Sequence, residues 1–291
     1  MGRPVIMKKF TEYLMHAVFL LTACVSVLAV VLICVFLFKN GFSAISQIGL
    51  GNFLTGTEWR PKNNVFGILP MIIGSIYVTV GAIVIGVPIG ILCAIFLAKF
   101  CPSAVYRIVK PVVNLMAGIP SVVYGFFGLM LIVPLFQQIF GSSGKGLLTA
   151  SVILGIMILP TVISVSEAAL RAVPDSYFEG ALALGATKEK SVLFTVVPAA
   201  KSGILAGVVL GIGRAIGETM AVIMVAGNQP QIPHSLLDGV RTMTANIVIE
   251  MGYATDLHRE ALVATAVVLF VFILIINLCV SLLRSKNSDR A

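Results

Sequence analysis

Long apolar runs recur along the whole chain. Six of them reach the roughly 20 residues that a helix rising about 1.5 Å per residue needs to cross the hydrocarbon core of a bilayer. They cover residues 17–38, a stretch within 67–98, 111–136, 147–170, 202–226 and 261–283. The pattern therefore predicts an all-α integral membrane protein with six transmembrane helices in one bundle.

Charge is too scarce for a soluble globule of this size. Of the 291 residues, 58% are hydrophobic and 11% are charged, whereas soluble domains have about 25% charged residues. A net charge of +8 would suggest nucleic-acid binding in a soluble protein. No compact basic run occurs, so we expect no nucleic-acid partner and assign the charge to residues flanking membrane spans.

Positive charges divide unevenly between the two sides of the predicted bundle. If the N-terminus is cytoplasmic, thirteen Lys and Arg residues fall in inner segments and six fall in outer loops. Because cytoplasmic segments carry the excess of Lys and Arg, both termini are expected in the cytoplasm. The first apolar run is too long for the core of a typical signal peptide, so we expect an uncleaved helix.

These predictions divide the chain into two parts. Residues 1–66 are expected to hold an N-terminal tail, the first helix and an outer loop. Residues 67–291 are expected to form a five-helix core with a cytoplasmic loop at 171–201 and a short C-terminal tail. At the inner end of the fourth span, Glu167 and Arg171 are spaced to pair across one helical turn.

No pattern of catalytic or metal-binding side chains stands out. HExxH and GxSxG do not occur, all four aspartates fall outside the predicted spans, and no two histidines have ligand spacing. The loop Gly141-Ser-Ser-Gly144-Lys145 has two residues between its glycines, not the four of a phosphate loop. We therefore expect no enzyme, no nucleotide site, and no metal or cofactor bound by this chain. A channel, a carrier or one subunit of a pump remains.

The inner loop 171–201 is rich in helix-boundary signals. Ser176 and Glu179 have the spacing of a capping box, Gly185 is a natural helix terminator, and Thr187 can cap a second helix. The loop is therefore predicted to form two short helices on the membrane surface. Apolar residues available for burial there are Leu182, Leu184, Val192 and Phe194.

This loop resembles the EAA motif of ABC importer permeases. In that family the motif reads Glu-Ala-Ala, three residues, Gly, nine residues, then Ile-x-Leu-Pro. Here Glu179-Gly180-Ala181 is followed by Gly185 and then by Thr195-Val196-Val197-Pro198 at the same spacings. The resemblance implies a type I ABC importer permease fold with a coupling helix that docks in a cleft of a cytoplasmic ATPase. The implied coupling residues are Glu179, Gly180, Ala181, Gly185 and Pro198; a plain connector is the alternative.

The fifth span combines charge with small residues. On a regular helix Arg214 and Glu218 share one arc of about 80° with Gly203, Gly207 and Gly211. Glycines at that spacing let backbones approach closely, so this face is expected to point into protein. An ionisable pair there marks a path or a partner, or it is a structural ion pair across one turn; both interpretations stay open.

R-x-x-G-E in this span resembles permeases of oxyanion importers. The segments 213–222 and 118–125 are similar to the phosphate branch, and to its PstC-type subunit more than its PstA-type subunit. The family implies a second homologous permease of PstA type, two cytoplasmic ATPase subunits that bind ATP and Mg, and an external phosphate-binding protein. It also implies the plasma membrane of a bacterium or archaeon.

Phosphate import is therefore the expected function. Arg214 can offer paired donors to phosphate oxygens, Ser121 and Tyr124 are candidate neutral donors on the path, and Glu218 is expected to hold or release Arg214. One alternative is a permease for sulfate or molybdate. Another is a secondary anion transporter driven by protons or sodium. A passive channel is disfavoured because no pore-ring motif occurs.

Overall fold

The computed structural model describes residues 5–288, with side chains between 12 and 278, and these residues are almost entirely helical. Residues 1–4 and 289–291, the extremes of the two expected tails, lie outside the described residues. The elements are α1 (Val5–Ile48), α2 (Leu50–Thr55), β1 (Trp59–Arg60), η1 (Pro61–Asn63), β2 (Val65–Phe66), α3 (Leu69–Ile95), η2 (Phe96–Phe100), α4 (Ser103–Gly118), α5 (Ser121–Phe127), η3 (Gly128–Ile132), α6 (Val133–Phe140), α7 (Leu147–Arg171), α8 (Asp175–Ala183), α9 (Lys188–Ser191), η4 (Val192–Val196), α10 (Val197–Ala199), α11 (Lys201–Gly217), α12 (Met220–Val225), α13 (Met243–Met251) and α14 (Asp256–Ser288).

The described residues contain five helices long and apolar enough to cross a membrane. They are Glu12–Ile48, Leu69–Phe100, Ser121–Phe140, Leu147–Arg171 and Asp256–Leu278. The run Lys188–Ala199 and α11, bent by 71° at the break between them, count as a sixth candidate if the pair is one span. The prediction of an all-α membrane protein is confirmed, and its six spans agree with the upper count of five to six candidates.

Helix α7 is the central rod of the bundle. It is the most buried of the candidate spans, with α3 along one side and α11 along another. The α3–α7 contact is close because small residues face each other: a Cβ added at Gly86 would lie 2.6 Å from the Gly155 carbonyl oxygen. The glycine ridge of α11 lies on α7 as predicted, since Gly207 and Gly211 are buried against Val162.

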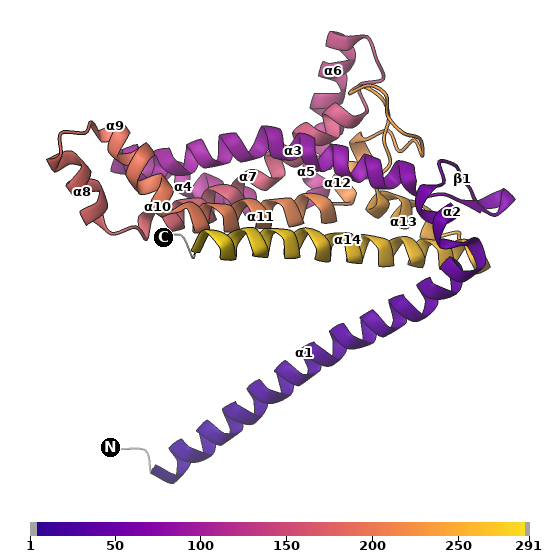
Figure 1. Cartoon of the computed structure of the whole chain (residues 1–291), viewed down its shortest axis with the longest axis horizontal. Helices are drawn as coiled ribbons and strands as arrows, with labels where there is room; N and C mark the ends of the chain where they lie inside the picture. The colour runs from indigo at the N-terminus through magenta and orange to yellow at the C-terminus, as the bar shows by residue number, and fades with distance from the viewer. Residues whose placement is uncertain (1–4, 289–291) are drawn as a thin grey trace.

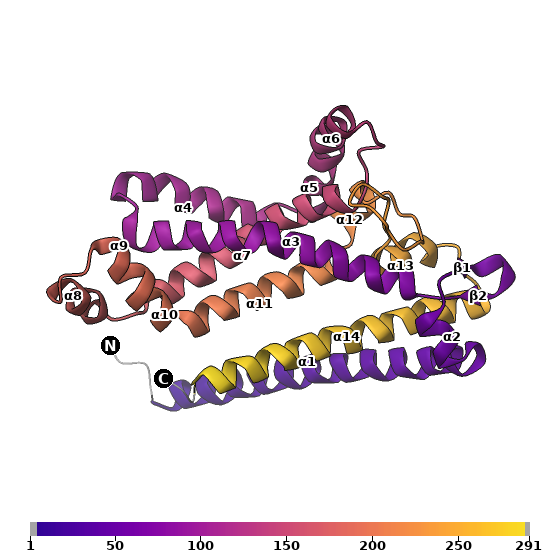
Figure 2. The same ribbon diagram turned by 45° about the horizontal axis from the view of Figure 1, so that its top comes forward.

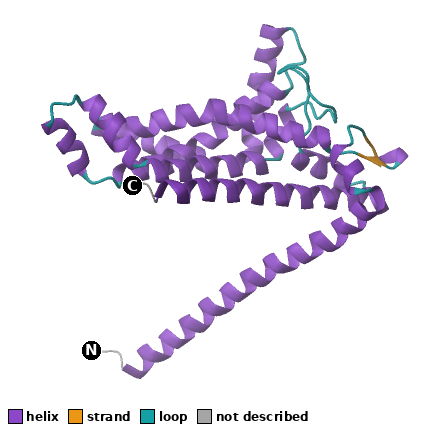
Figure 3. Ribbon diagram, viewed as in Figure 1, coloured by secondary structure: helices purple, strands orange, loops and turns teal. Residues whose placement is uncertain are grey.

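The two ends of the bundle differ. One end, which we call the loop end, carries α8 and α9 (Figure 2). The other, the hairpin end, carries α2, α13 and a small antiparallel hairpin in which Trp59 pairs with Phe66; this hairpin holds the two strands drawn in Figure 3. Helix α1 starts and α14 finishes toward the loop end (Figures 1 and 2).

Helix α1 leaves the bundle. Figure 1 shows it meeting α14 at the hairpin end and diverging from there. Close to the junction, Phe38 packs edge-on against Phe270 with ring centroids 6.1 Å apart, and Ala44 is fully buried. Farther along, the most apolar part of α1 is entirely unburied, so most of this helix contacts nothing else in the described chain.

Two expected spans are not continuous helices. The predicted third span, residues 111–136, is interrupted at Ile119 and Pro120, which are both extended. Proline disfavours helical geometry in the residue before it, which explains the break. The predicted fifth span, residues 202–226, is interrupted at Glu218 and Thr219, between α11 and α12.

A buried carboxylate ties the loop end together. Glu167 of α7 accepts hydrogen bonds from Tyr106 (2.9 Å), Lys110 (2.8 Å) and Arg171 (2.9 Å). Arg171 also donates to the Leu97 carbonyl oxygen at 2.8 Å. The pairing of Glu167 with Arg171 is confirmed, and the same carboxylate additionally fixes α4 against α7.

A second buried carboxylate, Glu250 of α13, ties the hairpin end together. It accepts from the Trp59 indole (2.7 Å) and the Arg241 guanidinium (2.7 Å), and it bonds the His258 ring at 2.8 Å. Arg241 also donates to the Asn246 side chain at 3.1 Å. One side chain therefore joins the hairpin, the segment before α13, and α14.

Replacement of Glu250 tests this junction. We expect Glu250→Gln to lower the free energy of unfolding by about 3 kcal/mol, because Arg241 is left buried without its countercharge. The measurement is thermal and denaturant unfolding of the purified protein in detergent. Glu58→Gln is the matched control: its partner Arg60 lies on the surface, so a loss below about 1 kcal/mol is expected. Equal losses in the two variants would contradict the role of Glu250.

Candidate functional site

The two helix breaks lie side by side inside the bundle. Helix α5, which follows the first break, packs on α12, which follows the second. The contact is so close that a Cβ added at Gly125 would lie 2.8 Å from both the Ala221 Cα and the Met224 Sδ. Broken helices at membrane depth expose helix termini, and such termini are the usual place for ion and substrate sites in transporters.

Glu218 occupies the second break. Its backbone is extended (ψ 137°), so the helix stops at Gly217. Its carboxylate Oε1 accepts from the N–H groups of Thr219 (3.0 Å) and Ala221 (3.3 Å), and its carbonyl oxygen accepts from the Thr244 hydroxyl at 2.9 Å. Glu218 therefore caps the amino end of α12, where the helix dipole favours negative charge.

The predicted arc of Arg214 and Glu218 on one continuous helix is wrong. The chain leaves the helix at Glu218, so the two side chains no longer have helical spacing. Among the described residues Arg214 forms no ion pair within 4.0 Å, because the Glu218 carboxylate is turned toward α12 instead. The structure therefore does not contain the structural ion pair that the spacing allowed.

Arg214 is half-buried in the last turn of α11. A cation is favoured there, because the carboxyl end of a helix carries partial negative charge. Arg214 lies four residues before Glu218, where α11 stops. It is thus a cation at the second break, with donors not committed to an ion pair in the described structure.

Tyr124 and Ser121 belong to the first break. Tyr124 is buried, and its hydroxyl donates to the Met116 carbonyl oxygen at 2.8 Å, across the interruption between α4 and α5. Ser121 is the first residue of α5 and is half-buried. All four predicted path residues therefore lie at the two breaks. The Tyr124 hydroxyl is already hydrogen-bonded to the backbone.

The loop end carries the predicted coupling residues. Gly185 follows α8 with φ +86°, a left-handed conformation, as the sequence predicted. Thr187 caps α9 by accepting from the Lys190 N–H at 3.4 Å, also as predicted. The predicted capping box is wrong: α8 begins at Asp175 after an extended Pro174, so Ser176 lies inside the helix and caps nothing.

Apolar side chains at this end are partly exposed. Of the four apolar residues available for burial, only Val192 is buried, in a cluster that includes Val196 and Ala200. Leu184 is 91% exposed and Phe194 77% exposed. Glu179 and Pro198, two of the expected coupling residues, are exposed as well.

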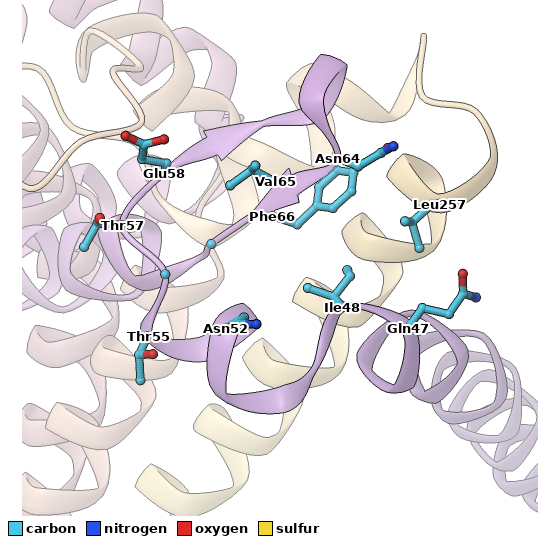
Figure 4. Close-up of a pocket in the computed structure, with 12 residues that line it drawn as sticks. Gln47, Ile48, Asn52, Thr55, Thr57, Glu58, Asn64, Val65, Phe66 and Leu257 are labelled. Atoms are coloured by element: carbon cyan, nitrogen blue, oxygen red, sulfur yellow. The ribbon is translucent and has the colours of Figure 1, made fainter.

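The hairpin end has an open hollow of about 560 Å³. Figure 4 shows the side chains around it, which come from several elements: Gln47 from the end of α1, Asn52 from α2, Phe66 from β2 and Leu257 from α14. Its lining is mixed polar and apolar, and it holds no cluster of cations.

Sequence reasoning singled out the four residues that lie at the breaks but missed both breaks and the Glu250 junction. The Ile119-Pro120 pair was a usable signal for the first break, because proline limits the preceding residue. The second break has no proline, and its signal, a glutamate that can cap the next helix, is ambiguous in sequence. Trp59 and Glu250 are 191 residues apart, so no local pattern could join them.

Interrupted helices that meet inside a membrane bundle, together with an exposed helical loop at one end, define a membrane transport subunit. Residues 86–288 match the family described as "Binding-protein-dependent transport system inner membrane component". The chain belongs to this family. It is a multi-pass membrane protein with a type I ABC importer permease fold.

Named relatives and solved structures agree with this assignment. The chain is 40% identical to the "Probable ABC transporter permease protein YqgH" of Bacillus subtilis, covering 89% of this chain and 88% of that protein. It is 37% identical to the "Phosphate transport system permease protein PstC" of Mesorhizobium japonicum, covering 91% of this chain and 88% of that protein. In fold it resembles a bacterial alginate ABC transporter, with a TM-score of 0.61 at 15% identity over 98% of this chain and 99% of the other. It also resembles the MetNI methionine transporter, with a TM-score of 0.60 at 19% identity over 79% and 99%.

Proposed function

We propose that this chain is a transmembrane permease subunit of an ATP-driven importer of inorganic phosphate, and that it pairs with a second, homologous permease. The observation that carries the proposal is Arg214, an arginine without an ion pair in the described structure, at the meeting point of two broken helices. Arginine presents planar paired donors that suit phosphate oxygens. The relatives named as phosphate permeases support the same substrate.

Glu218 gives this site a means of switching. The amino end of α12 favours an anion, and in this structure Glu218 supplies the negative charge. A phosphate ion beside Arg214 competes with that carboxylate for the same partial positive charge. We infer that passage of phosphate requires Glu218 to turn away from α12, so that the carboxylate excludes the anion in one state and admits it in another.

Helix α1 supports the pairing with a second permease. The most apolar part of α1 is unburied in the described part of the chain, and the helix points away from the bundle (Figure 1). This surface is therefore available to a second homologous subunit as well as to lipid. Such a partner also completes the path, because the broken helices of this chain surround only part of Arg214, which is left half-buried.

The loop end supports coupling to an ATPase. Its helices project beyond the spans, and their exposed apolar residues, Leu184 and Phe194, are available to a partner. We place this end in the cytoplasm, in agreement with the charge distribution. The hairpin end then lies outside, where an external phosphate-binding protein docks on it. Two ATPase subunits then supply ATP hydrolysis, with ATP and Mg bound by them and not by this chain. The plasma membrane of a bacterium or archaeon is the corresponding location.

Thiol labelling tests the orientation. In a background without the five native cysteines, Ser143→Cys should react in intact cells with an impermeant maleimide, because Ser143 is exposed beyond the end of α6. Lys188→Cys at the loop end should react only after the membrane is permeabilised. The reverse pattern would put the loop outside, away from ATP, and would overturn both the orientation and the coupling role.

Gly185 tests the coupling role of the loop. We expect Gly185→Val to abolish stimulation of ATP hydrolysis by the loaded binding protein, because a β-branched residue strains a backbone with φ +86°. Gly185→Asn should retain much of it, since Asn tolerates this conformation. Gly185→Asn is therefore the matched control, because it changes the same position without forbidding its backbone conformation. Full stimulation in Gly185→Val, with the complex assembled, would rule out this turn as the coupling element.

Arg214 tests the phosphate path. Uptake is measured in proteoliposomes holding both permeases and the ATPase, with the binding protein outside; the unmodified complex should import phosphate in preference to sulfate or molybdate. We expect Arg214→Gln to lower uptake at least about 100-fold, the effect of losing a buried charge-assisted contact worth about 3 kcal/mol. Arg214→Lys should retain only part of the uptake, because an ammonium group cannot form the paired contact with phosphate.

The double variant Arg214→Gln with Glu218→Gln separates a path from a structural role. If Arg214 binds phosphate, the double variant should transport as poorly as Arg214→Gln alone. Assembly is scored by co-purification with the ATPase. Normal transport by an assembled double variant would show that this site needs no charge, and would remove Arg214 from the path.

A further inference from the structure

A small basic pocket lies at the loop end, apart from the helix breaks. Its volume is about 260 Å³, and it is enclosed by η2, the first turns of α4 and the last residue of α7. Three cations line it, and two hydroxyl groups lie among them. These residues are Lys99, Arg107, Arg171, Ser103 and Tyr106.

The cations of this pocket are not balanced by the acids around it. Glu167 is shared between Lys110 and Arg171, and Asp175 lies 3.4 Å from Lys99 with a side chain that is 81% exposed. Arg107 is exposed and forms no ion pair within the described part of the chain. The three lining cations together with Lys110, which does not line the pocket, make four cations against these two carboxylates, an excess of two positive charges.

The pocket's donors are held in place before any ligand arrives. The Arg171 guanidinium is fixed by bonds to Glu167 and to the Leu97 carbonyl, and it lies 4.7 Å from the centre of the Tyr106 ring. These bonds use Nε and one terminal nitrogen, so the other terminal nitrogen stays free. Helix α4 begins at Ser103, and the partial positive charge at its amino end adds to the field.

The position of the pocket selects the ligand. Phe100 and Arg171 are the last residues of two membrane spans, so the pocket lies at the depth of lipid headgroups. A small hollow with several cations and the Ser103 hydroxyl as a further donor suits a compact anion with many oxygens better than the single carboxylate of a protein side chain. We propose that this pocket binds a phosphate group, carried either by an anionic lipid of the adjacent leaflet or by a free phosphate ion.

Ligand titration of the purified full-length chain in detergent tests this proposal. The probes are inorganic phosphate and a short-chain soluble phosphatidylglycerol, with short-chain phosphatidylcholine as the zwitterionic control. Binding is read from the rise in unfolding temperature and from adduct masses in native mass spectrometry. Each titration is repeated in the Arg214→Gln chain, so that binding at the helix breaks is separated from binding at the pocket.

The diagnostic variant is Lys99→Gln with Arg107→Gln, which keeps Arg171 and its contact to Glu167. We expect it to weaken binding of the effective probe at least about tenfold, the effect of losing charge-assisted contacts. Arg60→Gln with Lys62→Gln removes the same charge types at the hairpin end and should bind as the unmodified chain. The swapped variant Lys99→Arg with Arg107→Lys keeps both charges and should retain most of the binding.

The two probes distinguish the sources of the phosphate group. Binding of phosphatidylglycerol but not of inorganic phosphate assigns the pocket to a lipid, and the opposite result assigns it to the free ion. The proposal is overturned if neither probe binds, if phosphatidylcholine binds equally well, or if the Lys99/Arg107 variant binds as tightly as the unmodified chain. If binding of the probes is lost only in the Arg214→Gln chain, all binding occurs at the helix breaks, and this result would also overturn the proposal.

Discussion

In hydrocarbon every backbone N–H and C=O group needs a partner, because water is not there to supply one. A helix in a membrane can therefore stop only where other groups satisfy the freed ends. In this chain two helices stop, and the freed backbone groups find partners in two ways. The Glu218 carboxylate accepts hydrogen bonds from backbone N–H groups at the start of α12. The Tyr124 hydroxyl donates a hydrogen bond to a backbone carbonyl of α4. Both closures use polar side chains that a ligand can displace. The need to satisfy the backbone thus concentrates the exchangeable hydrogen bonds where α5 meets α12.

Rigid parts surround this adjustable centre. Helix α7 runs unbroken through the bundle, and close small-residue contacts hold α3 and α11 against it. At each end a buried carboxylate, Glu167 or Glu250, gathers donors from separate segments. Burying charge is costly unless it is paired and hydrogen-bonded, and both carboxylates have several partners. The ends are therefore fixed in geometry, while motion has its lowest cost at the breaks between them.

The sequence predicts those features that depend on neighbouring residues. Hydrophobic run length identified the six spans, the glycine spacing of α11 predicted its buried face, and Gly185 and Thr187 marked the turn of the loop. Sequence reasoning failed where contacts between residues distant in the chain determine the local structure. Glu218 leaves the helix because its carboxylate caps α12 and its carbonyl accepts from Thr244, and neither contact is visible in helical periodicity. For the same reason the ion pair that the spacing of Arg214 and Glu218 allowed is absent from the described structure, although both residues lie at the candidate site.

The linkage between the loop and the path follows from how α4 is attached. Tyr106 and Lys110 bind α4 to the Glu167 carboxylate near the loop end, whereas Tyr124 bridges α4 to α5 at the break. Lys99, next to α4, reaches Asp175, the first residue of α8. Asp175 also follows α7 closely in the chain, so α8 is linked both to the segment before α4 and to α7. Because α7 is continuous and α4 ends at a break, the angle between α4 and α5 can change without deformation of either helix.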